Sequence, residues 1–432
     1  MYIRTLAVSA VGIVVALALG GCSPGVADGG ADKVVINMVE SLTNPTRTVL
    51  LKEQIADFQK ANPSITVKMI SPPTDSGDQK IQTMLQSKTG IDVFEVGQIT
   101  VAGYAKNGWI RDISSDLDSW DGWKDVTQSA KDAVIQDGKY YYVPYGSYAT
   151  ALFYRTDLAQ QAGFSGPPDS WSDLIEQAKA INDPAQNRYG FSMRGGTNAG
   201  VEMTQMIEAY NADDIDRANA FLLKDGNTIF STAQAVKAME DRFDLYKNGS
   251  PPSSIGWGYP EMVQGFSSGL TAQVMQTQEV IATVEQATAI TTDKWATAPI
   301  PVGPTGKAPL IVSPSGWGVA QSSAHPVEAL KLVQYLTSGE QILRFDKENG
   351  QVPAVKSAGE DPFFKEGKWA AYVEMNDNPE KYPVVTEPRN VAWFAEWQAK
   401  SNKESQEFLL GKISPAELMA SWDKYWTEKR GK

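Results

Sequence analysis

The sequence predicts an α/β protein with more than one domain, and three observations carry this prediction. The chain has 432 residues, which is more than one hydrophobic core usually organises. Apolar runs at 34–39, 64–70 and 91–96 predict β-strands. Between these runs, apolar residues recur three or four positions apart, which predicts helices. Strands that alternate with helices in this way indicate βαβ units and a mostly parallel sheet.

The later part of the chain is predicted to hold a long β-segment and then mainly helices. The stretch 139–158, KYYYVPYGSYATALFYRTDL, predicts two apolar strands around a Pro-Tyr-Gly-Ser-Tyr turn. In the tail, Ser414 begins Ser-Pro-Ala-Glu, a capping box that predicts a helix start. Apolar periodicity predicts the remaining elements: helices at 171–181, 203–210, 236–246, 260–268 and 326–336, and strands at 271–276, 296–303 and 310–320.

The first 22 residues predict an exported lipoprotein. They begin MYIRT, continue as an apolar run and end in small residues, which is the layout of a signal peptide. The segment Leu19-Gly20-Gly21-Cys22 resembles a bacterial lipobox, which implies that Cys22, the only cysteine, receives a diacylglyceryl group and anchors the chain to the membrane. An ordinary signal peptide with an incidental cysteine is the alternative. Residues 23–32 lack large apolar side chains and predict a flexible linker.

Composition argues against several classes of function. The formal net charge of -12 disfavours nucleic acid as the main partner. The only histidine, His325, precedes Pro326 at a predicted helix start, so zinc sites and histidine-dependent nucleophilic catalysis lack their usual residues. No glycine-rich phosphate-binding motif is present in the sequence. We therefore expect binding rather than enzymatic catalysis, and no cofactor or metal, although 51 acidic residues leave carboxylate-only hydrolysis open.

Five segments of the chain resemble, in the same order, the extracellular solute-binding proteins of bacterial ABC importers. The resemblance is strongest to the large carbohydrate-binding group that includes the maltose-type binding proteins, and it extends over nearly all of the chain after the linker. The segments are IDVFEVGQITVAGYAKNGWIRDI at 91–113, YYYVPYGSYATALFYRTDL at 140–158, FSSGLTAQVMQ at 266–276, the stretch from PIPVGP to LTSGEQ at 299–341, and GQVPAVKSA at 350–358.

This resemblance implies a two-lobe, periplasmic-binding-protein-like fold with a hinged ligand cleft between the lobes. The chain would cross between lobes near 145, 295 and 339. The N-terminal lobe would then hold 33–145 and 296–338, and the C-terminal lobe 146–295 and 339–432. The protein would be a monomer at the outer face of the bacterial cell membrane, where it would bind a small carbohydrate (a mono- or disaccharide or a sugar alcohol) and deliver it to the importer's permease subunits. A polyamine, a peptide or another charged metabolite is the alternative ligand, and a secreted carboxylate-only glycoside hydrolase is the alternative from another class.

A carbohydrate site needs a flat aromatic surface and planar polar groups, because a sugar presents a ring face and a rim of hydroxyls. The chain is rich in aromatic residues, with 12 tryptophans. Trp317 is the strongest candidate for the aromatic wall, since Gly316 and Gly318 flank it in a segment that predicts a tight turn. Further aromatic candidates are Tyr145, Tyr148, Trp257 and Trp393, with core packing as the alternative for Trp393 and for one of the two tyrosines.

Polar candidates lie mainly in loops that follow predicted strands. The resemblance implies ligand contacts for Glu40 and Ser41 after the first strand, where a helix-capping turn is the alternative, and for Gln98 after the third strand. Arg194 precedes two glycines and could clamp paired oxygens, with a surface arginine as the alternative. Many relatives have a tryptophan where this chain has Glu279, and Glu40 and Glu279 together in the cleft would favour a cation. The remaining polar candidates are Gln276, Gln278 and Arg389.

Overall fold

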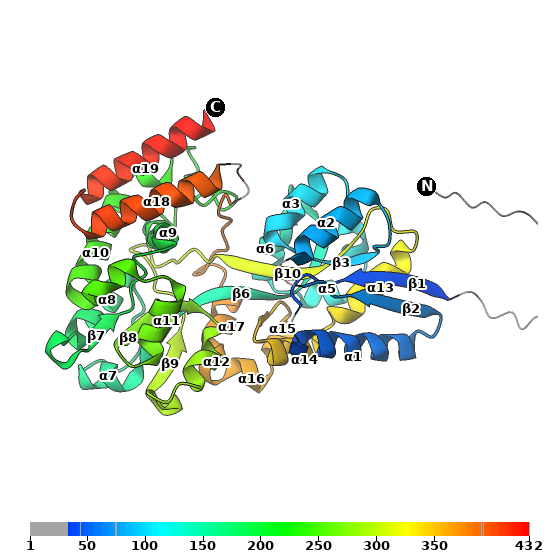
Figure 1. The fold of residues 1–432 in the computed structure, drawn as a ribbon, viewed down its shortest axis with the longest axis horizontal. Helices are drawn as coiled ribbons and strands as arrows, with labels where there is room; N and C mark the ends of the chain where they lie inside the picture. Colours follow the sequence, from blue (N-terminus) through cyan, green and yellow to red (C-terminus); the bar gives the residue numbers. More distant parts are fainter. Residues whose placement is uncertain (1–32, 44, 74–75, 390, 392, 432) are drawn as a thin grey trace, which may run out of the picture.

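The structure, a computed structural model, describes residues 33–43, 45–73, 76–389, 391 and 393–431. These residues form two α/β lobes that lie side by side along the longest axis of the molecule (Figure 1). The predicted signal peptide and linker, with Cys22, lie outside the described residues. Within the described part of the chain, no helix combines the length and the apolar character needed to cross a membrane.

The first lobe contains the parallel strands that the sequence predicted. β1 (Val34–Val39) pairs in parallel with β2 (Ile65–Ile70) and with β3 (Val93–Gly97). Helix α1 (Pro45–Ala61) ends two residues before Pro63, since the residue before a proline disfavours helical dihedrals. The other elements of this lobe are α2 (Gly77–Ser87), α3 (Gln98–Lys106), α4 (Ser114–Asp118), α5 (Gly122–Asp125), α6 (Gln128–Val134), the hairpin of β4 (Ile135–Gln136) and β5 (Lys139–Tyr140), α13 (Pro326–Leu336), α14 (Gly339–Asn349) and α15 (Lys356–Gly359).

The second lobe is mainly helical, as predicted, and its strands extend the same sheet. β8 (Thr271–Thr277) lies between β6 (Tyr142–Arg155) and β7 (Tyr189–Phe191), and β9 (Trp295–Ala298) also pairs with β6. Its helices are α7 (Thr156–Gln161), α8 (Trp171–Ile181), α9 (Ala199–Tyr210), α10 (Ala233–Gly249), α11 (Tyr259–Ser267), α12 (Val280–Glu285), α16 (Pro362–Lys365), α17 (Ala370–Asp377), α18 (Phe394–Leu409) and α19 (Pro415–Arg430), which begins at the predicted capping box.

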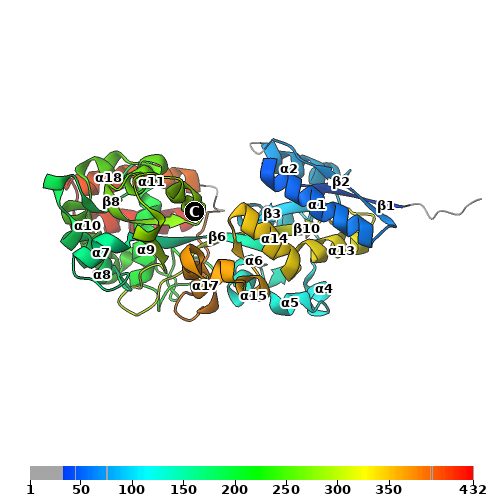
Figure 2. The same cartoon turned by 90° about the horizontal axis from the view of Figure 1, so that it is seen from below.

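Strand β6 connects the two lobes, as the turned view in Figure 2 shows. It has 14 residues without a break, so the turn predicted within 144–148 is wrong. The first half of β6 pairs with β10 (Val312–Val319), and its second half pairs with β8. Partners in both lobes therefore keep the strand extended through Gly146, where β11 (Val352–Pro353) also joins it. This shared stretch of β6, β10 and β11 is the hinge region.

Two clusters of buried apolar side chains define the lobes, and they place the boundaries differently from the sequence. Trp295, Ile300 and Leu310 belong to the cluster of the second lobe. Phe345 and Val355 belong to the cluster of the first lobe. The reason is that β9 pairs with the second-lobe half of β6, and α14 packs against α1. The chain therefore crosses within β10 rather than near 295, and it returns to the second lobe after 358 rather than near 339.

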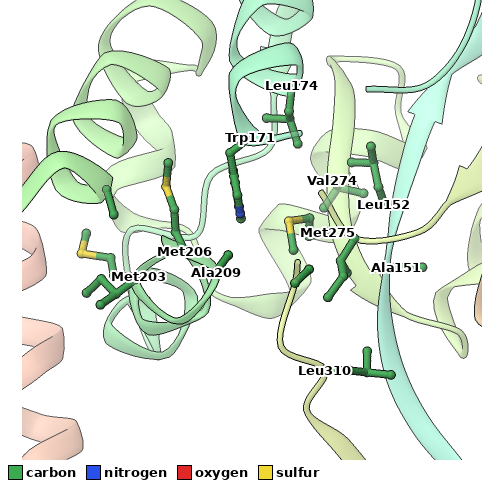
Figure 3. Close-up of a cluster of buried hydrophobic side chains, with 14 of the residues drawn as sticks. Ala151, Leu152, Trp171, Leu174, Met203, Met206, Ala209, Val274, Met275 and Leu310 are labelled. Atoms are coloured by element: carbon green, nitrogen blue, oxygen red, sulfur yellow. The ribbon is translucent and has the colours of Figure 1, made fainter. Parts of the chain in front are cut away.

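The core of the second lobe contains the methionine and aromatic stripes that the helical periodicity predicted. Met203 and Met206 of α9 are buried with Trp171 of α8 and Met275 of β8 (Figure 3). Flexible thioethers fill the irregular space between helices and sheet in such a core. These residues therefore stabilise the second lobe.

Candidate functional site: the interlobe cleft

Two hollows lie where the lobes meet. The larger, of about 170 Å³, is lined by the first lobe, by the hinge strands and by Arg389 of the second lobe. The smaller, of about 60 Å³, lies between α3 and the segment 386–389. Gln98, the first residue of α3, and Arg389 line both hollows. The polar side chains around the larger hollow are Ser41, Asp78, Glu95, Gln98, Thr100, Tyr148, Ser313, Ser315 and Arg389.

A buried ionic network fixes the first-lobe wall of this cleft. One oxygen of Glu95, Oε2, accepts hydrogen bonds from the backbone amides of Ser41 at 2.7 Å and Leu42 at 3.1 Å. The other, Oε1, accepts from Arg47 Nη2 at 2.6 Å and from the hydroxyl of Tyr145. Arg47 also donates to Glu40 Oε2 at 3.0 Å. The loop after β1 is therefore held rigidly, with its polar groups already paired.

This network decides which of the candidates after β1 and on β6 reach the cleft. Glu40 is 0% exposed and is paired with Arg47 and Thr48, so its role is structural. Ser41 lines the larger hollow, and its contact with a ligand stays a prediction. Tyr145 is buried in the first-lobe core, whereas Tyr148 lines the hollow.

The structure places Trp317 in the core of the first lobe, contrary to the prediction of an exposed aromatic wall. The side chain is 1% exposed, and its ring centroid lies 5.7 Å from that of Tyr145. Its flanking glycines are part of β10 rather than of a turn. A Cβ atom added to Gly316 would lie 2.2 Å from the carbonyl oxygen of Val143, so this glycine permits close strand packing.

Gln276 near the end of β8 and Gln278 just after it also have structural partners. Gln278 is buried, accepts a hydrogen bond from the amide of Ala149 and donates one to the carbonyl of Ser147, which ties β8 to the hinge. Gln276 is buried and accepts from the amide of Thr277. Neither glutamine is among the described residues that line the two hollows.

Glu279 is exposed and lies beside two tyrosines. It accepts hydrogen bonds from the hydroxyls of Thr277 and, at 3.4 Å, of Tyr259. Burial and then the negative charge of Glu279 raise the pKa of Tyr148 and that of Tyr259. Glu279 therefore stands near Tyr148, although it is not among the residues that line the two interlobe hollows.

Three further candidates lie outside both hollows. Arg194 Nε donates to the carbonyl of Thr197 at 2.7 Å, and Trp257 packs over Gly265 beside a separate hollow on the second lobe. The ring centroid of Trp393 lies 4.4 Å from that of Trp426, so Trp393 packs against the second-lobe core. In this conformation the structure brings together Ser41, Gln98, Tyr148 and Arg389 from the predicted set.

Sequence reasoning missed several residues of the cleft. Asp78 lies at the start of α2, and burial together with the negative charge of Glu95 raises the pKa of its carboxyl group. Ser313 and Ser315 flank Pro314 on β10. The position of Asp78 after β2 was a usable signal, because loops at the carboxyl ends of parallel strands line such clefts. The serines gave no signal, since only the pairing of β10 with β6 places them there.

Comparison with known proteins agrees with this geometry. A family profile described as "Bacterial extracellular solute-binding protein" matches residues 44–342. The chain belongs to this family. That membership confirms the predicted resemblance, and it confirms that this solute-binding protein is not an enzyme, because the family is one of binding proteins.

Individual relatives are distant but extend over much of this solute-binding protein. The mannitol-binding protein of Pseudomonas aeruginosa is 27% identical over 220 residues, which is 50% of this chain and 49% of the relative. The erythritol/L-threitol-binding protein of Mycolicibacterium smegmatis is 22% identical, over 60% of this chain and 58% of the relative. The structure of the sugar-binding protein MalE from Xanthomonas citri covers 91% of this chain and 96% of its own at 22% identity, with a TM-score of 0.76, which confirms the two-lobe periplasmic-binding-protein-like fold.

Proposed function

We propose that this chain is the lipid-anchored substrate-binding protein of an ABC importer and captures a small carbohydrate, a sugar or sugar alcohol, between its lobes. Hinge closure around β6 would enclose the ligand, and the closed form would deliver it to the permease. The protein would act as a monomer at the outer face of the cell membrane.

The observation that carries this proposal is the chemistry of the larger hollow. Its walls combine hydroxyls of Ser41 and Thr100, the amide of Gln98, the carboxyl of Asp78 and the guanidinium of Arg389, contributed by both lobes. Such groups pair with adjacent hydroxyls, which a sugar presents around its rim and a sugar alcohol along its chain. Two relatives whose names specify sugar alcohols support the same class of ligand.

The alternative of a cationic ligand loses its main support from the position of Glu40. That alternative required Glu40 and Glu279 to face the cleft together. Glu40 is instead buried and paired with Arg47.

Thermal unfolding of the purified protein against a panel of small molecules tests the class of ligand. The panel is D-mannitol, erythritol, D-glucose, maltose, putrescine and glycine. A ligand that binds only the folded state raises the unfolding midpoint by mass action. We expect at least one carbohydrate to raise the midpoint and putrescine and glycine to leave it unchanged. A response to putrescine or glycine alone would overturn the proposal.

The lipid anchor is tested separately, because it depends on Cys22 and not on the cleft. Intact-mass analysis of protein from bacterial membranes should show a diacylglyceryl group on the chain, and the Cys22→Ser variant should lack it. An unmodified mature chain released into the medium would contradict the anchor while leaving the ligand proposal intact.

A further inference from the structure

Arg389 is the second lobe's contribution to the larger hollow, and an acidic neighbour holds it. Its Nε donates to Glu387 Oε2 at 2.5 Å, and its backbone amide donates to the carbonyl of Glu387 at 2.8 Å. The side chain of Arg389 is 40% exposed, whereas that of Glu387 is 2% exposed. The Glu387 side chain is therefore almost fully covered at the edge of the smaller hollow, and the more exposed guanidinium of Arg389 extends from it into the cleft.

A second buried acid lies close behind this pair. Glu208 of α9 is 1% exposed, and neither of its carboxyl oxygens has a hydrogen-bond partner in the described part of the chain. Burial and then the negative charge of Glu387 raise the pKa of Glu208 well above its ordinary value, while Arg389 opposes this. Of the two buried acids, Glu387 is therefore the one that binds Arg389 directly, and Glu208 lies behind the pair without a hydrogen-bond partner among the described residues.

The rest of the Arg389 guanidinium is available to a ligand. A guanidinium has five N–H donors in a fixed fork, and the bond to Glu387 uses the one on Nε. Among the described residues, no hydrogen-bond partner is found for Nη1 or Nη2. The planar fork can thus donate to two adjacent oxygens, while Gln98 of the first lobe lines the same two hollows.

We propose that Glu387 is a positioning residue for ligand recognition: it fixes Arg389 in the cleft so that the guanidinium can bridge neighbouring hydroxyls of the carbohydrate. This inference rests on the proposed function. Its physical basis is that a long side chain held in its binding conformation loses less rotamer freedom when the ligand arrives. Without Glu387, Arg389 would keep its charge and exposure but would sample other conformers, and the affinity would fall.

A double-mutant cycle separates positioning from a merely structural role. The probe is the carbohydrate of the panel that raises the wild-type midpoint most, and its dissociation constant is measured by calorimetry. We expect Glu387→Gln to weaken binding about tenfold and Arg389→Ala at least tenfold. In the Arg389→Ala background, adding Glu387→Gln should change the affinity less than twofold, because Glu387 acts through Arg389.

Asp157→Asn is the matched control. Asp157 lies in the same lobe and binds an arginine two residues away: Arg155 Nη2 is 2.6 Å from Asp157 Oδ2. Neither Asp157 nor Arg155 lines the two interlobe hollows. We expect Asp157→Asn to leave the affinity unchanged. A loss in Asp157→Asn as large as in Glu387→Gln would overturn the inference, because any weakened ion pair of the lobe would then have the same effect.

The remaining outcomes also decide the question. Wild-type affinity in Glu387→Gln, or the same tenfold loss with and without Arg389, would overturn the inference while the proposed function stands. If Glu387→Gln fails to fold, Arg389→Lys replaces it, since lysine keeps the charge but lacks the Nε donor that Glu387 binds; undiminished affinity would overturn the inference. A wild-type protein that binds no carbohydrate of the panel would overturn the proposed function and this inference together.

Discussion

Glu95 in the first lobe and Glu208 in the second are both almost fully buried, yet their surroundings are opposite. Glu95 accepts hydrogen bonds from two backbone amides, the hydroxyls of Ser41 and Tyr145, and Arg47. Glu208 accepts none from the described residues, and burial and then the charge of Glu387 raise the pKa of its carboxyl group. Glu95 therefore holds the first-lobe wall of the cleft together through its hydrogen bonds. Glu208 lies behind Arg389, and its carboxyl oxygens have no hydrogen-bond partner among the described residues.

The difference teaches how the two sides of the cleft are built. The loop after β1 is preorganised, because its donors are paired before any ligand arrives. The second-lobe side depends on an exposed arginine held by one neighbour, with the unpaired acid Glu208 behind it. An extended paired network on one side and a single arginine held by one acid on the other suit a cleft that closes on its ligand.

The hinge adds a third buried acid. Asp346 of α14 is 0% exposed, and neither carboxyl oxygen has a partner in the described part of the chain. This acid lies against the hinge strand, since a Cβ atom added to Gly146 of β6 would lie 3.0 Å from Oδ1 of Asp346. Unpaired buried acids thus occur behind Arg389 and at the strand on which the lobes turn, whereas the network around Glu95 is paired.

The largest expected loss of stability follows from removing Glu95, which breaks the buried ionic network. Glu95→Ala leaves Arg47 with a single acidic partner and removes the acceptor of two backbone amides. Breaking a buried ion pair in this way costs about 3–5 kcal/mol. We expect chemical denaturation to show a loss of that size in the free energy of unfolding. A loss below about 1 kcal/mol would mean that the network does not stabilise the first lobe.

Replacing Glu208 should have the opposite effect and increase the free energy of unfolding. The folded-state pKa is raised above the ordinary value of 4.5, so the folded protein holds a proton that the unfolded chain releases. The contribution of Glu208 to stability is therefore most favourable below pH 4.5, and it decreases as the pH rises toward the raised pKa, by up to about 1.4 kcal/mol per pH unit. Glu208→Gln should remove this slope and stabilise the protein by about 1–3 kcal/mol at neutral pH. Parallel pH profiles of stability in the two proteins would contradict the comparison.

Asp346→Asn should also increase the free energy of unfolding, but by less than Glu208→Gln. Burial alone raises the pKa of Asp346 well above 3.8, without a neighbouring negative charge. The stabilisation is expected to be about 1 kcal/mol at neutral pH, because the new amide is itself unpaired. Thermal unfolding between pH 4 and pH 8, within the range in which the wild type folds reversibly, measures this gain. A destabilised Asn variant would indicate that the acid is charged and paired in solution.

The smallest effect is expected for an exposed acid of the first lobe. Glu53 binds Arg344 Nη2 at 2.5 Å, but both side chains are largely in solvent. Glu53→Gln should change the free energy of unfolding by less than about 1 kcal/mol. This variant is the control for Glu95→Ala, since both remove an acid that binds arginine. Comparable losses in the two variants would show that burial does not set the difference.

Local patterns predicted much of the fold. The strands β1, β2 and β3, the helix start at Pro326 and the capping box at Ser414 follow from periodicity and capping chemistry. The turn predicted within 144–148 was wrong because β6 has partners in both lobes, and such pairing is not local. The same pairing buries Trp317, whose glycine neighbours indicate a turn only when the strand beside them is unknown.

The candidate site was less predictable, because it depends on contacts between distant segments. Ser41, Gln98 and Tyr148 follow or lie on strands whose ends meet at the cleft. Glu40 follows the same strand as Ser41, yet the burial of Arg47 makes it structural. Glu387 gave no signal at all, since its importance comes from Arg389 beside it and Glu208 on a helix 179 positions earlier in the chain.

The most direct test of the account is the affinity of the best carbohydrate of the panel for two single variants, Gln98→Ala in the first lobe and Arg389→Ala in the second. Calorimetric titration of each, beside the wild type, asks whether one ligand contacts both lobes. The account predicts that each variant binds at least tenfold more weakly while unfolding at an unchanged midpoint without ligand. Wild-type affinity in either variant would contradict it, because the carbohydrate would then rest on a single lobe.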